Sequence, residues 1–349
     1  MNGEHGQDSA NGHVEQAGHD HQEKPHTHAE TEHDKLGPIG AKASSLHDPA
    51  ALRAMLVHEF ESAAHDAKHA VSAVDHSASD AVHSSRKALR KARAVLGMLA
   101  GALPKSERRA VKRALQQARR ALSTVRDHAV APGTLATLPL GDEERVTADA
   151  VLAAAAQALP STHDIRQLVA EAAARAAAQA EAIQAALPAE LDWDHALDGV
   201  RQLYAEARRA RRASKRRPAQ FHAWRRRAKE LVYQLAILKS HAGPRVAAIH
   251  AEIEAVTDTL SPAVDLVMVH EFVGTYGEGT THEAIQHLQT AVDAALGDAI
   301  KVGRKAGKDP FRAGSKRFAK RLAKAIKRDL TPADDVAPHD EHEAADAAP

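Results

Sequence analysis

Two stretches of the chain, VHSSRKALRKARAVL at residues 82–96 and FHAWRRRAKELVYQL at residues 221–235, share one pattern. Each begins with an apolar residue and a histidine, continues with basic residues, and then runs on with the period of an amphipathic helix. His83 and His222 are 139 positions apart, Pro104 and Pro244 are 140 apart, and the segments STVRD and SPAVD are 138 apart. Because the offset is nearly constant at three landmarks, we predict two similar helical repeats.

The rest of the sequence between residues 46 and 330 is typical of helices as well. Ala, Leu, Arg, Glu, Gln and Lys dominate, runs of β-branched residues are absent, and Pro and Gly fall between the long helical stretches. We therefore predict an all-α fold with two pseudo-symmetric helical-bundle subdomains, formed by repeat 1 at about 46–140, connecting helices at about 141–190, and repeat 2 at about 191–330. The expected helices are 49–78, 81–101, 104–126, 142–158, 161–187, 191–215, 219–241, 244–260, 263–273, 281–303 and 309–329.

Charge is distributed unevenly along the chain, although 47 basic and 46 acidic residues give a formal net charge of only +1. Residues 1–45 hold eight acids and three lysines, and residues 331–349 hold six acids and no Lys or Arg, so residues 46–330 carry +12. We expect both acidic tails to be disordered, because their low hydrophobicity cannot support a packed core. The basic domain between them predicts a polyanionic partner.

The chain has no cysteine, which excludes disulfides, thiol nucleophiles and thiolate metal sites. Its first 35 residues have neither the apolar segment of a secretory signal nor the low acid content of a transit peptide. No apolar run approaches the length of a transmembrane helix. We therefore expect a soluble, cytoplasmic protein.

Basic side chains form stripes when the sequence is placed on helices with about 100° per residue. In the first repeated stretch, at residues 82–96, one half of the helix holds His83, Arg86, Lys87, Arg90, Lys91 and Arg93. The second repeated stretch, at residues 221–235, has a matching stripe of His222, Arg225, Arg226, Lys229 and Tyr233. We call these two stretches the signature helices. Further stripes comprise Lys112, Arg119 and Arg126; Arg201, Tyr204, Arg208 and Arg212; and Arg304, Lys308 and Lys316. A solvated helix face is the alternative for any one stripe, but residues 201–229 hold thirteen Lys, Arg or His and one acid, Glu206, which favours an anionic ligand.

Three motifs carry a resemblance to a known family. They are His83-x-x-Arg86-x-x-x-Arg90-Lys91-x-Arg93, Val125-Arg126-Asp127, and Phe221-His222-x-Trp224-Arg225-Arg226-Arg227-x-Lys229-x-x-x-Tyr233. Over about residues 46–330 the chain resembles the CHAD family, the conserved histidine α-helical domain. The resemblance implies two four-helix subdomains with a basic groove or pore between them that binds inorganic polyphosphate without catalysis. Some family members localise to polyphosphate granules.

No catalytic motif accompanies this resemblance. CHAD domains often accompany a triphosphate-tunnel hydrolase with the signature Glu-x-Glu-x-Lys, which this chain lacks, and it has no phosphate-binding loop of the GxxxxGK[ST] kind. We therefore predict no enzymatic activity, no cofactor and no metal ligand. Two alternatives stay open: a duplex nucleic-acid-binding protein, and a metal-binding or scaffold role of the His-rich tail through His19-Asp20-His21 and His26-Thr27-His28.

Overall fold

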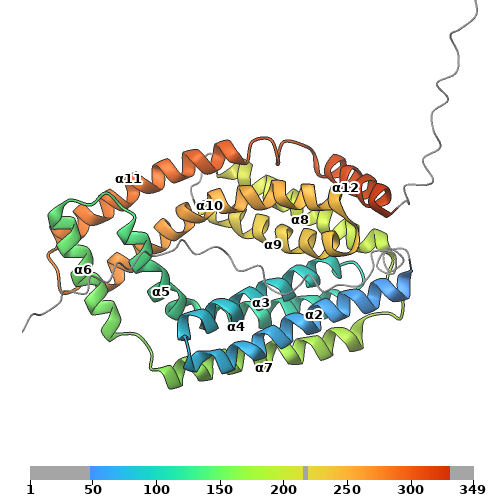
Figure 1. Cartoon of the computed structure of the whole chain (residues 1–349), viewed down its shortest axis with the longest axis horizontal. Helices are drawn as coiled ribbons and strands as arrows, with labels where there is room; N and C mark the ends of the chain where they lie inside the picture. Colours follow the sequence, from blue (N-terminus) through green and yellow to red (C-terminus); the bar gives the residue numbers. More distant parts are fainter. Residues whose placement is uncertain (1–47, 215–218, 331–349) are drawn as a thin grey trace, which may run out of the picture. The chain divides into compact units, whose positions relative to one another are not determined.

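The computed structural model describes residues 48–214 and 219–330, and the predicted tails at 1–45 and 331–349 lie outside these ranges. Within them the chain forms eleven α-helices, one 3-10 helix and no strand, which confirms the predicted all-α fold (Figure 1). The elements are α2 (Pro49–Ser72), η2 (Ala73–Asp75), α3 (Ala78–Met98), α4 (Lys105–Ala121), α5 (Ser123–Ala136), α6 (Asp142–Gln157), α7 (Thr162–Ala186), α8 (Trp193–Ala213), α9 (Ala219–His241), α10 (Pro244–Tyr276), α11 (His282–Ala306) and α12 (Ser315–Leu330).

Side-chain caps mark the beginnings of the first two helices. The carboxylate of Asp48 accepts a hydrogen bond from the backbone N–H of Ala50 at 3.0 Å, and α2 begins between them. The hydroxyl of Ser77 accepts one from the backbone N–H of Asp80 at 3.2 Å at the beginning of α3. Such acceptors satisfy N–H groups that have no partner inside the helix. They explain why the predicted beginnings of these helices lie close to the observed ones.

The helix predicted at 104–126 is wrong in its extent, because the chain forms two helices there. Helix α4 ends before Leu122, whose φ of −90° and ψ of 8° depart from helical geometry, and α5 then continues through Pro132 to Ala136. The side chain of Leu122 is fully buried in the core. The break separates two packing partners, since α4 packs mainly against α7 whereas α5 packs against α10.

The break predicted between residues 260 and 263 is also wrong. Helix α10 continues through Pro262, which is exposed, to Tyr276. A proline removes one helical hydrogen bond and displaces a carbonyl group of the preceding turn. Here the Ser261 hydroxyl donates to the Thr257 carbonyl oxygen at 3.1 Å, and the flanking Leu260 and Ala263 are fully buried. This packing keeps the helix continuous.

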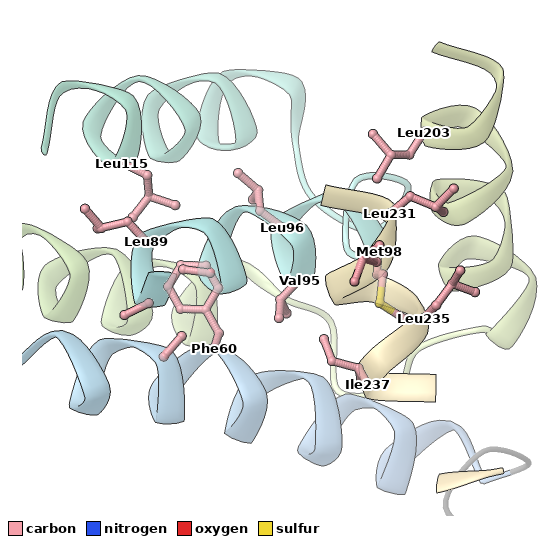
Figure 2. Packing of buried hydrophobic residues seen from close by; sticks show 14 of the residues in the cluster. Phe60, Leu89, Val95, Leu96, Met98, Leu115, Leu203, Leu231, Leu235 and Ile237 are labelled. Atoms are coloured by element: carbon pink, nitrogen blue, oxygen red, sulfur yellow. The ribbon is translucent and has the colours of Figure 1, made fainter. Parts of the chain in front are cut away.

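Apolar side chains from both predicted repeats form one main hydrophobic cluster. Figure 2 shows Phe60 of α2, Leu89 of α3 and Leu115 of α4 in the same cluster as Leu203 of α8 and Leu235 of α9. The core is therefore continuous across the expected boundary between the repeats. The two-subdomain arrangement and its boundaries stay predictions.

Helix α3 packs against α2, α4, α7, α8 and α9 (Figure 1). At the crossing with α8, a Cβ atom at Gly199 would collide with the carbonyl oxygen of Gly97. At the contact with α9, the fully buried Gln234 donates from Nε2 to the carbonyl oxygen of Ala94 at 2.9 Å. These close contacts hold α3 against the helices of the second repeat.

A second, smaller cluster lies where α5, α6, α10 and α11 meet, and it includes Leu135, Val151, Phe272 and Leu288. Helix α10 contributes to both clusters, since Leu260 belongs to the main one. In the described part of the chain, no helix combines the length and the apolar character that crossing a membrane requires.

Candidate anion-binding site

The two signature helices, α3 and α9, pack against each other, and basic residues of both repeats meet at this contact. Arg90 of α3 interacts electrostatically with Tyr233 and Arg225 of α9. Arg119 of α4 and Arg126 of α5 both interact with His222. We use the name cationic cluster for the residues that interact in this way: His83, Arg86, Arg90, Arg119, Arg126, His222, Arg225, Arg226 and Lys229.

Arg86 lies deep in the cationic cluster, with only 8% of its surface exposed. Its Nη1 donates to the carbonyl oxygen of Arg119 at 2.9 Å, whereas its Nε has no hydrogen-bond partner among the described residues. Burial, followed by the charges of Arg90 and Arg119, lowers the pKa of Arg86 to about 9. Burial, followed by the charges of Arg93 and Arg90, lowers the pKa of Arg119 to about 10. Both groups are cationic at neutral pH and gain stability from an added anion.

Helix α9 contributes the other half of the cluster. Arg225 donates from Nη2 to the hydroxyl of Ser261 on α10 at 3.0 Å, and burial followed by the charge of Arg90 lowers its pKa. Burial and then the charge of Arg227 lower the pKa of Arg226. Burial also lowers the pKa of Lys229, although Asp258, 3.8 Å away, opposes this shift.

The two histidines occupy equivalent repeat positions and remain accessible to solvent. Partial burial lowers the pKa of His83, and the charges of Arg90 and Lys87 lower it further. Partial burial lowers the pKa of His222 in the same way, followed by the charges of Arg226 and Arg225. Nearby cations disfavour the imidazolium form, so they add to the lowering of both histidine pKa values by burial.

Arg126 is the cluster residue that carries acidic partners from both repeats. It is ion-paired with Asp127 at 3.0 Å and with Asp265. These two aspartates hold equivalent places in the repeated segments STVRD and SPAVD, but the second segment has Val264 where the first has Arg126. One arginine therefore serves as the counter-ion of both.

A cavity of about 280 Å³ lies between α3, α4, α8 and α9, next to the cluster. Arg93 and Arg227 line it, and both pair with the buried Glu230, at 2.7 Å and 3.0 Å. Lys112 lines it as well, and burial followed by the charges of Arg227 and Arg93 lowers its pKa. Arg227 also pairs with Glu206 at 2.9 Å. Glu206 and Glu230 thus offset part of the positive charge of the cavity lining.

Some predicted site residues have partners away from the α3–α9 contact. Lys91 pairs with Glu59 of α2 at 3.1 Å, and Arg201 pairs with Asp198 of its own helix. Arg208 donates to the carbonyl oxygen of Arg312 at 3.2 Å. Arg304 donates to the carbonyl oxygen of Ser214. The remaining predicted residues of this group are exposed to solvent: Lys87, Arg212, Lys308 and Lys316.

Tyr204 was expected to face the anion with the stripe of α8, but its side chain is fully buried. Its hydroxyl donates to the carbonyl oxygens of Pro310 at 2.9 Å and Ala313 at 3.2 Å. Its ring stacks on Phe318 of α12 with the centroids 4.0 Å apart. Tyr204 therefore joins α8 to α12, and we leave it out of the proposed site.

Two features were missed when the helices were considered one at a time. Ser261 is a hydrogen-bond partner of Arg225, and the repeat offset that pairs it with Ser123 was the available signal. Arg109 lines the 280 Å³ cavity beside Arg108, and its place in the basic sequence of α4 was the signal for it. No group of three or more His, Asp or Glu in the described ranges is arranged to hold a metal ion, and the His-rich tail lies outside those ranges.

Comparison with protein families gives a match to the CHAD domain over residues 34–274, which is more than half of the chain. Among curated proteins no match was found. The matched region contains α3, α4 and α9, the helices that carry most of the cationic cluster, together with α10 as far as residue 274. The chain belongs to the CHAD domain family.

Proposed function

We propose that the cationic cluster binds inorganic polyphosphate and that the protein acts by binding, not by catalysis. The observation that carries this proposal is the meeting of buried and partly buried cations from the two repeated segments. Arg86, Arg90, Arg119, Arg225 and Arg226 have no acidic partner within ion-pair distance among residues 48–214 and 219–330. Family membership supports the same ligand, because polyphosphate binding is a general association of CHAD domains.

A linear polyphosphate suits such a cluster for physical reasons. Each phosphate unit carries negative charge and oxygen acceptors, and guanidinium groups donate paired hydrogen bonds to them. The cluster arginines are already partly desolvated, so the bound chain meets cations whose charges water screens only weakly. Release of counter-ions condensed on the chain adds to the affinity, by analogy with nucleic acids. Polyphosphate granules are the proposed cellular location.

Duplex nucleic acid is the alternative polyanionic ligand, and a competition-binding experiment distinguishes it from polyphosphate. A labelled long polyphosphate is displaced by unlabelled polyphosphate or by duplex DNA of equal phosphate concentration at one fixed salt concentration. We expect polyphosphate to displace the label at much lower concentration, because the cluster lies among packed helices and offers no groove-reading helix. Equal displacement by the duplex would favour the nucleic-acid function.

The first prediction is that binding depends on both repeats. Replacing Arg86, Arg90, Arg225 and Lys229 by alanine should abolish polyphosphate binding, since each desolvated contact contributes on the order of 1–3 kcal/mol. Affinity is measured by fluorescence anisotropy of labelled long-chain polyphosphate, and helicity by circular dichroism. Unchanged affinity in a helical quadruple variant would remove the cluster from consideration.

The quadruple variant could lose binding through a change in folding, because Arg86 is buried and donates a hydrogen bond to the carbonyl oxygen of Arg119. A smaller variant and a charge-matched control address this. The double variant Arg90→Ala with Lys229→Ala changes equivalent positions of the two repeats and avoids that problem. Its control is Lys68→Ala with Arg175→Ala, which removes two exposed cations from α2 and α7. We expect weaker binding in the first pair and wild-type binding in the second.

A further inference from the structure

A second basic site lies away from the cationic cluster, between α8, α10, α12 and the segment 309–314. These elements surround a cavity of about 840 Å³. Its accessible apolar lining includes the exposed Ala248 and the half-buried Pro310, above the buried Ile249 and Phe318. Its cationic lining consists of Arg245, Arg312, Arg317, Arg321, Lys324 and Arg328. We call this cavity the α12 pocket, and none of its lining residues belongs to the cationic cluster.

Arginine and lysine are segregated on α12. Residues 317, 321, 324 and 328 follow one another at intervals of four, three and four, so they share one face of the helix, and all four line the pocket. Three of these four are arginines. The remaining basic residues of α12 are Lys316, Lys320 and Lys327, and none of them lines the pocket. Arginine is therefore concentrated on the face of α12 that lines this open pocket, where planar guanidinium groups are accessible to a ligand.

Two acids hold part of this lining in place. Asp329, whose side chain is fully buried, accepts hydrogen bonds from the backbone N–H groups of Arg245 and Val246 and pairs with the Arg245 guanidinium at 3.1 Å. Arg321 pairs with Glu252 of α10. The pocket lining also contains one acid of its own, Asp309. The acids thus fix Arg245 and Arg321 at the edge of the pocket.

Four cations of the lining lack such partners. Arg312, Arg317, Lys324 and Arg328 are not ion-paired with any acid in the described part of the chain, and all four are exposed to solvent. Like charges spaced by one helical turn repel one another. An anion bound in the pocket would relieve this repulsion.

The lining points to a ligand with two parts. Guanidinium groups recognise phosphate oxygens through paired hydrogen bonds, and several of them together suit closely spaced phosphates. The volume lies within the range of small-ligand sites, and the exposed Ala248 and the half-buried Pro310 offer apolar surface that an inorganic chain cannot use. The segment 309–328 also lies beyond the residues matched by the CHAD domain. We propose that the α12 pocket binds a small organic oligophosphate, in which a ring system carries two or more phosphates.

The test uses the full chain and isothermal titration calorimetry at one near-physiological salt concentration. ATP is the organic probe, and inorganic tripolyphosphate is the probe without a ring system. The pocket variant combines Arg317→Ala, Lys324→Ala and Arg328→Ala. The control variant combines Lys301→Ala, Lys305→Ala and Lys320→Ala, which removes three exposed cations from α11 and α12 outside the pocket.

We expect the Kd of ATP to rise at least about ten-fold in the pocket variant and less than about two-fold in the control, since one lost phosphate contact corresponds to roughly a factor of ten. Wild-type protein should bind ATP more tightly than tripolyphosphate, because only ATP uses the apolar lining. Equal ATP affinity in the pocket variant and the wild type would overturn the site. Tripolyphosphate binding as tight as ATP binding would overturn the organic ligand.

The variant Arg90→Ala with Lys229→Ala separates this proposal from polyphosphate binding. In that variant we expect ATP affinity to stay at the wild-type value while affinity for long polyphosphate falls. Loss of ATP binding there would place ATP in the cationic cluster and would contradict a separate pocket. Failure of long polyphosphate to bind the wild type would leave the ATP result unaffected.

Discussion

At the scale of single residues, the two histidines connect ligand binding to pH. His83 interacts with Lys87, Arg90 and Arg126, while Asp80 partly opposes these cations. His222 interacts with Arg226, Arg225, Arg119 and Arg126. In the free protein, partial burial followed by these cations holds the pKa of both imidazoles below the usual value of about 6.5. A bound phosphate chain adds negative charge and raises both pKa values.

The second prediction follows from this difference between the free and bound states. Because the complex holds protons more tightly, affinity for polyphosphate should be greatest below the free-state pKa and should fall as pH rises through the bound-state pKa. Replacing His83 and His222 by Gln should flatten the affinity profile between about pH 5.5 and 8. Anisotropy titrations with long chains, whose end groups are few, measure the profile. A double variant with the wild-type slope would show that the histidines do not titrate with binding.

The third prediction concerns Asp265, which neutralises Arg126 and opposes the lowered pKa of Arg225. Asp265→Asn should raise the affinity for polyphosphate roughly three-fold to ten-fold, because it removes a negative charge that competes with the ligand. This change corresponds to a gain in binding free energy of about 0.6–1.4 kcal/mol. Asp258→Asn is the control, since Asp258 is exposed and its pairing with Lys229 is long, so it should change affinity less. A weaker complex of Asp265→Asn would mean that the aspartate is needed to orient Arg126.

Residue positions on a single helix were predictable, whereas their partners on other helices were not. His83 and His222, which the repeat offset pairs, both lie near cations, as the helical wheel predicts. The wheel could not show that Glu59 pairs with Lys91 or that Tyr204 is buried under α12, since both depend on packing between distant segments. Whether the predicted residues bind polyphosphate stays a prediction.

At the scale of helices, the errors of prediction occurred where tertiary packing outweighs local propensity. Pro262 suggests a helix end, yet the buried apolar residues on both sides of it keep α10 continuous. No Gly or Pro marks the end of α4 at Leu122, although the Ser123 and Thr124 that follow are weaker helix formers than the residues before them. The break there reflects the different partners of α4 and α5.

The fourth prediction concerns the crossing of α3 and α8. Gly199→Ala should destabilise the protein by on the order of 1–3 kcal/mol, because the new methyl group meets the backbone of Gly97, which cannot move aside as a side chain would. Thermal unfolding followed by circular dichroism measures the change. Gly297→Ala on α11 is the matched control, where the added methyl group has open space and alanine should stabilise the helix by up to about 1 kcal/mol. Equal melting temperatures for the two variants would contradict the close crossing.

At the scale of the whole molecule, the charge of residues 46–330 is +12, and the two terminal segments reduce the total to +1. Long-range attraction of a polyanion depends on the total field as well as on local contacts, and salt screens it over about 10 Å at 0.1 M ionic strength. The terminal segments should therefore weaken the attraction most at low salt.

The fifth prediction tests that effect. Deleting residues 1–45 and 331–349 should leave the helical content unchanged and should leave the affinity for polyphosphate equal or higher, with the larger gain at low salt. Affinity is measured for both proteins over a series of salt concentrations. A large loss of affinity on truncation would instead make the His-rich segment part of the site.

The equivalent pairs His83 and His222, and Arg86 and Arg225, all interact electrostatically with a single arginine, Arg126, and the third pair, Arg90 and Lys229, interact with each other. A ligand that enters from the first repeat meets a histidine, an arginine and a second cation, and a ligand that enters from the second repeat meets the same kinds of group. Nucleic acids have distinct 5′ and 3′ ends, but a linear polyphosphate reads identically in both directions. Under the proposed function, such a polymer can bind the duplicated cluster in either orientation, whereas a chain with two distinct ends presents different groups to it in each orientation.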